Sequence, residues 1–149
     1  YGSGLVAKGT GILLNNEMDD FSAKPGTPNG YGLIGGDANA VEGNKRPLSS
    51  MSPTMVMKDG KPFIVTGSPG GSRIINITLQ MIMNVIDHNL NIAEATAAAR
   101  MHHQWLPDFI WVEHTLNRDT ISLLEAKGHK VKVFGASDPR RAGSAAIGY

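Results

Sequence analysis

The pattern of apolar and polar positions predicts a tight hairpin near the middle of the chain. Residues 54–57 and 63–67 are rich in apolar and β-branched side chains, and Asp59-Gly60 lies between the two runs. An Asp-Gly pair in this place is typical of a two-residue turn with positive φ angles. We therefore expect two antiparallel strands with Asp59 and Gly60 at the tip.

The apolar segment that follows predicts a helix. Residues 74–86 are apolar nearly all round, which favours a helix that is buried on most of its surface. Asn91 is followed three residues later by Glu94, a spacing that resembles a capping box. We expect this box to open a short alanine-rich helix that ends at Ala99.

Local signals also mark a helix and a strand in the last third of the chain. Asn117 is the expected N-cap of a helix that ends near Lys127, and Gly128 suits the left-handed residue that follows. Residues 131–133 then predict a strand. Helices that alternate with strands and hairpins favour a layered domain of the α+β class.

The first fifty residues have a different pattern. Residues 11–16 predict a short buried strand that ends in two turn-forming asparagines. Residues 22–44 contain two prolines and six glycines, with only isolated apolar residues. Long loops in compact domains are commonly lids over a site or are disordered. We interpret residues 22–44 as a lid-like loop.

Composition excludes several classes of function. The 149 residues are 41% hydrophobic, enough for one ordinary core, and 14 Lys+Arg stand against 13 Asp+Glu. This balance provides no strong field for a nucleic-acid backbone or an anionic lipid surface. No apolar run approaches the roughly 20 residues of a membrane-spanning helix. We therefore expect no nucleic-acid partner and no membrane span in this chain.

The most specific chemical signal is the glycine-rich turn at residues 67–73 (Gly-Ser-Pro-Gly-Gly-Ser-Arg), between a predicted strand and a predicted helix. Glycine lets the backbone bend there and come close to a ligand. Backbone amides beside a helix N-terminus stabilise a phosphate, a carboxylate or the oxyanion of acyl transfer. From these residues alone the ligand stays open, and so does a turn without any ligand.

Other polar clusters leave more alternatives. Glu17, Asp19 and Asp20 could bind an ammonium group or a hard cation, or face water, and they lack the regular ligand spacing of a calcium loop. The hydroxyls of residues 49–52 have no Gly-x-Ser-x-Gly frame, so binding suits them better than nucleophilic attack. Adjacent His102 and His103 point in different directions, which disfavours a metal site. We expect no metal and no cofactor.

Aromatic residues cluster around a proline in the same region. Trp105, Phe109 and Trp111 lie close to Pro107, without the interleaved basic residues that stacking on nucleic-acid bases would need. We therefore interpret the three aromatic side chains as parts of the hydrophobic core.

Three of these segments, in this order and spacing, resemble the small subunit of γ-glutamyltranspeptidases: residues 13–21, 45–54 and 66–74. The likeness extends to residues 93–95, 102–107 and 135–140, so it covers almost the whole chain. It implies an N-terminal-nucleophile hydrolase fold, with four layers in the order αββα, completed by a large subunit cut from the same precursor. Residues 1–149 would then be most of the small, catalytic subunit.

The resemblance also implies the reaction. Members transfer a γ-glutamyl group from glutathione or a related amide to an amino acid, a peptide or water, through a threonyl acyl-enzyme. The family's nucleophile is an N-terminal threonine, which uses its own α-amine as the base. Tyr1 does not fit that role, so we expect a missing segment before residue 1. A second missing segment is expected between residues 133 and 134.

Matched residue by residue, the resemblance assigns a γ-glutamyl site. Gly70 and Gly71 match the oxyanion-hole glycines. Ser49 and Ser50 match residues that hold the donor's α-carboxylate, and Asp20 matches the partner of its α-ammonium group. Glu17 beside it departs from the Gln of many bacterial members. Tyr31 matches a residue of the lid that covers the site.

Two alternatives remain beside the γ-glutamyl interpretation. A β-lactam (cephalosporin) acylase of the same superfamily would share the fold and the oxyanion glycines, but would not need Asp20. An inactive module could instead use the glycine-rich turn to bind an anion. Bacterial members with this kind of lid are usually periplasmic or secreted, and the resemblance implies the same location here.

Overall fold

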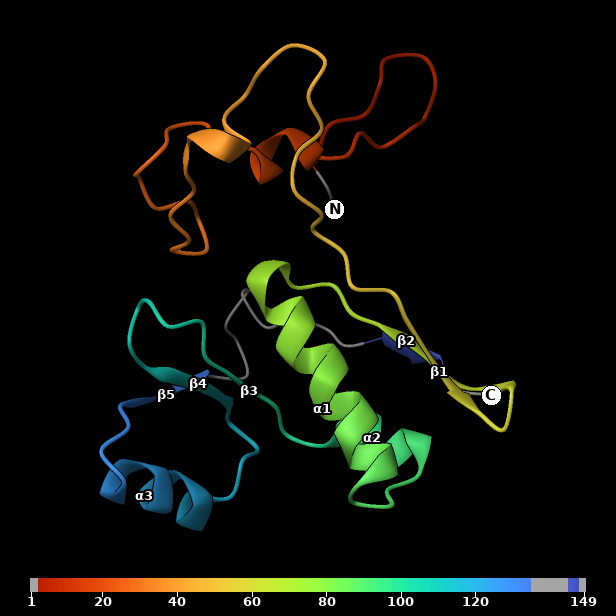
Figure 1. The fold of residues 1–149 in the computed structure, drawn as a ribbon, viewed down its shortest axis with the longest axis vertical. Helices are drawn as coiled ribbons and strands as arrows, with labels where there is room; N and C mark the ends of the chain where they lie inside the picture. Colours follow the sequence, from red (N-terminus) through yellow and green to blue (C-terminus); the bar gives the residue numbers. More distant parts are fainter. Residues whose placement is uncertain (1–2, 135–144, 148–149) are drawn as a thin grey trace. The chain divides into compact units, whose positions relative to one another are not determined.

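The computed structural model describes residues 3–134 and 145–147. The chain divides into two compact units, residues 1–50 and residues 51–149, and each is described by itself. Figure 1 shows the first unit in red to orange and the second in yellow to blue. The described residues form an α+β structure, as the alternation of helical and strand signals predicts.

The first sheet has the strand order β1-β2-β6 and is antiparallel throughout. Its strands are β1 (Thr54–Lys58), β2 (Lys61–Gly67) and β6 (Ala145–Ile147). Asp59 and Gly60 join β1 to β2 with φ angles of 51° and 76°, the combination that the right-handed twist of a hairpin requires. The predicted hairpin is confirmed.

Two helices follow this hairpin: α1 (Ile74–Ile86) and α2 (Ile92–Ala97). The predicted bounds of α1 are confirmed, but the prediction that it is buried nearly all round is wrong. One face of α1 is buried through Ile77 and Met81, whereas Ile75 and Leu79 on another face are 67% and 52% exposed. Although α1 is apolar nearly all round, it packs on one side only.

The capping box of α2 forms as predicted. The backbone N–H of Glu94 donates to the side chain of Asn91 at 3.0 Å, and the Glu94 carboxylate accepts the Asn91 N–H at 3.0 Å. The helix ends at Ala97, two residues before the predicted Ala99. The reason is that Ala98 has an extended ψ of 140°, which ends the helical hydrogen-bond pattern.

The second sheet has the order β3-β4-β5. Strands β3 (Met101–His102) and β4 (Ile110–Glu113) are antiparallel, and β4 is parallel to β5 (Val131–Phe134). Helix α3 (Arg118–Ala126) connects β4 to β5. Its predicted N-cap is confirmed, because Asn117 accepts the Asp119 N–H at 2.8 Å, and Gly128 after the helix has a φ of 90°.

The first unit contains two short 3₁₀ helices, η1 (Glu17–Asp20) and η2 (Asp37–Asn39). The predicted buried strand at residues 11–16 is wrong. This segment folds back on residues 3–7, where Leu14 donates to the Leu5 carbonyl at 2.9 Å, and makes one isolated β-bridge. Ile12 and Leu13 are 61% and 54% exposed, so this ribbon of two short segments does not bury its apolar side chains.

Residues 22–44 form an irregular segment, as predicted. Apart from η2 it contains only the isolated bridges Ser22–Ala40 and Pro28–Ile34. Its role as a lid stays a prediction. In the part of the chain that the structure describes, no helix has both the length and the apolar character needed to cross a bilayer.

Candidate functional site

The glycine turn, residues 67–73, links the end of β2 to the start of α1. Gly70 has a φ of 139° and Gly71 a φ of 59°, and Gly71–Arg73 form the 3₁₀ helix η3 that leads directly into α1. A φ of 139° is accessible to glycine alone. The first N–H groups of a helix lack partners within the helix, so a turn of this kind can offer backbone donors. The predicted tight turn is confirmed.

Side chains of the turn fix it to the second sheet. The Ser72 hydroxyl donates to Oε1 of Gln104 at 2.8 Å. Arg73 Nε donates to the Gly70 carbonyl at 3.4 Å, and the Arg73 guanidinium lies 5.4 Å from the centre of the Phe134 ring. The conformation of the turn therefore depends on residues that are distant in the sequence.

His102 contacts the same Gln104 side chain and is only 5% exposed. Its Nδ1 lies 2.8 Å from the side-chain oxygen of Asn76 on α1, and its Nε2 lies 2.8 Å from Oε1 of Gln104. Burial lowers the pKa of His102 below its ordinary value of 6.5. The positive charges of Arg73 and His103 lower it further, and the hydrogen bond with Gln104 opposes them. These effects together favour the neutral ring.

A neutral ring has a single N–H, and the neighbouring amides decide which nitrogen carries it. Gln104 is oriented by its Nε2, which donates to the Leu106 carbonyl at 3.0 Å, so its Oε1 faces both Ser72 and His102. His102 therefore donates from Nε2 and accepts at Nδ1. This tautomer requires the amide nitrogen of Asn76, rather than its oxygen, to face the ring.

His103 points away from His102, as expected for neighbours on a strand end. Its Nε2 lies 3.6 Å from a carboxylate oxygen of Asp108, and its Nδ1 accepts the Trp105 N–H at 3.2 Å. Among residues 3–134 and 145–147, no three His, Cys, Asp or Glu side chains gather as metal ligands.

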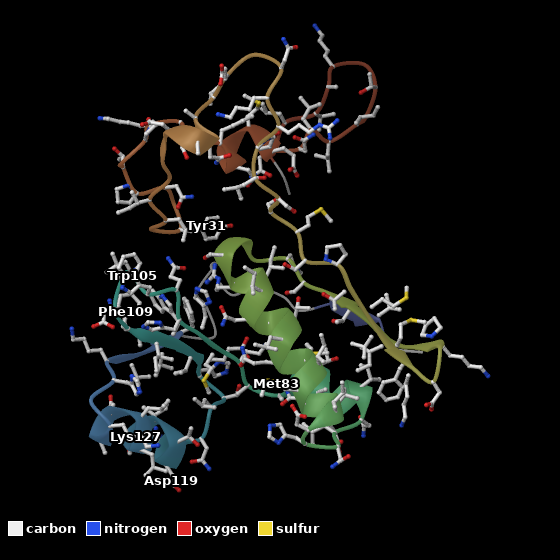
Figure 2. The ribbon with its side chains drawn as sticks, in the orientation of Figure 1. Tyr31, Met83, Trp105, Phe109, Asp119 and Lys127 are labelled. Atoms are coloured by element: carbon white, nitrogen blue, oxygen red, sulfur yellow. The ribbon has the colours of Figure 1, made fainter. Side chains whose placement is uncertain are left out.

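The aromatic cluster divides into half-buried and exposed members. Trp111 stacks on Phe134 at 4.3 Å and meets Phe109 edge-on at 4.6 Å, so its predicted packing role is confirmed. The same prediction is wrong for Trp105, which is 77% exposed. Trp105 has a φ of 70° in a tight turn, which directs its side chain outward. Figure 2 labels Trp105 and Phe109 on the connection between β3 and β4.

In the first unit, the acidic residues lie on η1. Glu17 and Asp19 are exposed and Asp20 is half-buried. The Glu17 N–H donates to the Asn15 side chain at 3.0 Å, which fixes the start of the 3₁₀ turn. The three carboxylates therefore have different environments, and Asp20 is the most enclosed of them.

Asn39 connects this acidic segment to the segment that contains the two serines. Its Nδ2 donates to the Asp20 carbonyl at 2.7 Å, and its Oδ1 accepts the Leu48 N–H at 3.0 Å. Ser49, which follows Leu48, is exposed, and Ser50 is half-buried. Sequence reasoning missed Asn39, since an asparagine within a glycine- and proline-rich loop is an ordinary turn residue.

Tyr31 lies at the tip of a small turn and is 50% exposed (labelled in Figure 2). The Asn29 side chain accepts the N–H groups of Tyr31 and Leu33 at 2.9 and 3.0 Å. The predicted site residues Glu17, Asp20, Tyr31, Ser49 and Ser50 thus belong to the first unit. Gly70 and Gly71 belong to the second.

Comparisons with known proteins cover almost the whole chain. A family model described as γ-glutamyltranspeptidase matches residues 1–148. The glutathione hydrolase proenzyme of Escherichia coli is 59% identical over the full chain, which covers 29% of that protein. The chain thus spans less than a third of the length of the first curated relatives it matches.

Solved structures also match this chain over almost its whole length. A mutant γ-glutamyltranspeptidase of Helicobacter pylori is 50% identical with a TM-score of 0.84, over 99% of this chain and 84% of that chain. A cephalosporin acylase of Bacillus halodurans is 27% identical with a TM-score of 0.74, over 99% of this chain and 30% of that chain. From the match over residues 1–148 and these identities, the chain belongs to the γ-glutamyltranspeptidase family.

Proposed function

We propose that the protein containing this chain transfers γ-glutamyl groups from glutathione and related amides to amino acids, short peptides or water. The observation that carries this proposal is the 59% identity, over the full chain, to a glutathione hydrolase proenzyme. The acylase alternative is less well supported, because the cephalosporin acylase is 27% identical whereas the γ-glutamyltranspeptidase structure is 50% identical. An inactive anion-binding module is not favoured by any of these relatives.

The donor's head group carries one cation and one anion, and a site that excludes water must pair both. We assign Asp20 to the α-ammonium group, with Glu17 on the same 3₁₀ turn as a second acceptor. Ser49 and Ser50 are assigned to the α-carboxylate. The hydrogen bonds of Asn39 support this assignment, because they join the Asp20 backbone to the residue before Ser49.

The glycine turn is assigned to the reacting carbonyl. A threonine hydroxyl attacks the γ-carbonyl carbon, and the amides of Gly70 and Gly71 stabilise the oxyanion that develops. The C–N bond then breaks, the hydroxyl proton reaches the leaving amine through the threonine's α-amine, and a γ-glutamyl ester remains. An acceptor amine or water attacks this ester and releases the hydroxyl.

This proposal assigns the nucleophile to a threonine that is not among residues 1–149. Labelling with a γ-glutamyl-like electrophile such as azaserine, followed by mass spectrometry, tests the assignment. We expect the adduct on an N-terminal threonine peptide outside this sequence. An adduct on a serine or threonine of residues 1–149 in fully active protein would overturn it.

The first sheet supports a four-layer αββα sandwich completed by a large subunit of the same precursor. Ile64 is 2% and Thr66 is 5% exposed, so one face of β2 is covered. The opposite face presents Met55, which pairs with Val65 and is 57% exposed. An apolar sheet face of this kind needs a second layer. We propose that a sheet of the large subunit covers it.

We also propose that residues 1–149 are most of the small subunit, that residues 22–44 with Tyr31 form a lid, and that the protein is periplasmic or secreted. The alignment with the Escherichia coli relative runs over 167 positions for the 149 residues here. This difference supports an additional internal segment, which we place between residues 133 and 134, before the last residue of β5. Cell fractionation tests the location.

The charge pairing of Asp20 gives the sharpest test of the function. In the full-length protein, Asp20→Asn should lower kcat/KM for γ-glutamyl-p-nitroanilide, since a desolvated ammonium loses its partner. The expected loss of transition-state stabilisation is about 2–4 kcal/mol. Asp19→Asn, on the exposed side of the same turn, is the matched control. Glutaryl-p-nitroanilide lacks the α-amine, so its slower turnover should not respond to Asp20→Asn. Unchanged kcat/KM for the γ-glutamyl donor would favour the acylase instead.

A further inference from the structure

We propose that Asn39 is a positioning residue that holds the two ends of the γ-glutamyl head-group site in register. This inference rests on the proposed function, because it presumes that Asp20 and Ser49 bind the same donor. Asn39 is not one of the residues that the family resemblance assigns to the site. Its place in the hydrogen-bond pattern of the first unit singles it out.

Two side-chain hydrogen bonds of Asn39 reach the two ends of the site, and two further bonds join Asn39 to Ser22. Its amide nitrogen donates to the Asp20 carbonyl at 2.7 Å and reaches the Ser22 hydroxyl at 3.5 Å. Its own carbonyl accepts the Ser22 N–H at 2.8 Å. Its side-chain oxygen accepts the Leu48 N–H at 3.0 Å, immediately before Ser49. The peptide groups beside Asp20 and Ser49 are thus bound to one side chain.

An amide is the side chain that suits this place. It offers a donor and an acceptor on adjacent atoms, and here the donor meets a carbonyl while the acceptor meets an N–H. Rotating the amide by 180° would set oxygen against the Asp20 carbonyl and nitrogen against the Leu48 N–H, so the orientation is determined. Alanine or leucine at position 39 would leave both backbone groups without these partners.

The rest of the first unit provides little regular structure to replace these bonds. Within residues 3–50 the structure describes two short 3₁₀ helices and isolated β-bridges, with no ladder of paired strands. Side-chain hydrogen bonds therefore hold the relative positions of the acidic segment and the serine segment. Phe21, which follows Asp20, is 8% exposed.

The experiment uses the full-length, processed protein with Asn39→Ala and the near-isosteric Asn39→Leu. Asn117→Ala is the matched control, because it also removes an asparagine that accepts a backbone N–H, at 2.8 Å, but at the start of α3. For each variant, KM for γ-glutamyl-p-nitroanilide, kcat per titrated active site and Tm are measured. Turnover of glutaryl-p-nitroanilide, which presents only the carboxylate, is the second readout.

We expect both Asn39 variants to raise KM for the γ-glutamyl donor by about tenfold, with kcat per active site within about threefold of wild type. The glutaryl donor should respond less, because it needs only one end of the site. Asn117→Ala should lower Tm at unchanged KM. An unchanged KM in both Asn39 variants of an active protein would overturn this inference alone, and so would a loss of kcat equal for both donors. Wild-type protein without γ-glutamyl activity would overturn the proposed function together with this inference.

Discussion

The Ser72 hydroxyl donates to Oε1 of Gln104 across 2.8 Å, and this bond ties the glycine turn to a residue 32 positions later in the chain. The same oxygen lies 2.8 Å from Nε2 of the buried His102. An oxyanion hole is effective when its donors are held in place before the reaction. The Ser72–Gln104 pair is therefore the contact through which the second sheet supports the proposed oxyanion site.

Replacing Gln104 by leucine should lower kcat and leave the donor's KM nearly unchanged. The variant removes the bonds of Gln104 to Ser72, His102 and Leu106. Loss of the Ser72 bond alone, worth about 0.5–1.5 kcal/mol, corresponds to a roughly two- to twelvefold fall in kcat. Gln80→Leu is the control, since Gln80 bonds the Met101 backbone at 2.8 and 2.9 Å without touching the glycine turn. Steady-state kinetics with active-site titration measures kcat and KM of both variants. An equal kcat in Gln104→Leu and Gln80→Leu would contradict the supporting role.

Gly70 and Gly71 should differ in their tolerance of alanine. The φ of 139° at Gly70 lies outside the regions open to L-residues, whereas the φ of 59° at Gly71 lies in the left-handed region, where an L-residue costs about 1–2 kcal/mol. Gly70→Ala should therefore distort the turn and remove an oxyanion donor, at a cost of roughly 2.7–4 kcal/mol in kcat.

Gly71→Ala should have the smaller effect on kcat. Both variants are assayed in the full-length protein, with Tm measured in parallel so that unfolding is recognised. Full kcat in both variants would refute the oxyanion assignment. A larger loss in Gly71→Ala than in Gly70→Ala would show that the backbone conformation is not the deciding factor.

His102 should make stability depend on pH on the acid side of neutrality. Its pKa is lowered by burial, so the unfolded chain binds a proton more readily than the folded chain. Stability is therefore complete above about pH 6.5 and falls as the pH drops from 6.5 toward the lowered pKa. The charges that face the ring, Arg73 and His103, act in the same direction. Urea unfolding of wild type and His102→Gln between pH 7.5 and pH 5 measures the effect.

The His102→Gln variant should have a flatter stability profile in this range, because glutamine does not titrate. Carboxylates contribute equally to both proteins, so the difference between the two curves isolates the imidazole. Parallel curves for wild type and variant would contradict the prediction.

Two neighbouring glycines in the lid-like loop provide a further matched pair. A β-carbon on Gly35 would overlap the Ser22 side chain, whereas one on Gly36 would meet no atom within 4 Å. Gly35→Ala should displace Ser22 and with it the bonds to Asn39, at a cost of about 1–3 kcal/mol, and Gly36→Ala should be neutral. Limited proteolysis of residues 22–44 and the donor's KM measure the effect. Equal behaviour of the two variants would disprove the steric explanation.

Elements with local signals were predictable from the sequence. The Asp59-Gly60 turn and the Asn91 and Asn117 caps depend on residues within a few positions of one another, and all three formed as predicted. Burial was less predictable. Ile75 and Leu79 are apolar yet exposed, since packing is decided by neighbours that no local pattern reveals.

The residues of the candidate site were likewise predictable only where the signal was local. The glycine turn was recognisable, because an unusual backbone needs a particular residue. Gln104, His102 and Asn39 were not assigned their structural roles, since each acts through partners 19 to 32 positions away, as for Asn39 with Asp20 and Ser72 with Gln104. A pattern read over a short window cannot contain such pairs.

The pairing of β2 with β6 has a consequence for synthesis on the ribosome. It joins Gly67 to Ala145, so the β6 side of β2 stays open until almost the whole segment has been made. At ~5–20 residues per second, the delay between these two residues is at least roughly 4–16 s, and the proposed additional segment would lengthen it. An open strand edge of this kind readily pairs with another chain. The nascent polypeptide thus passes through an interval in which chaperone binding to β2 would compete with aggregation.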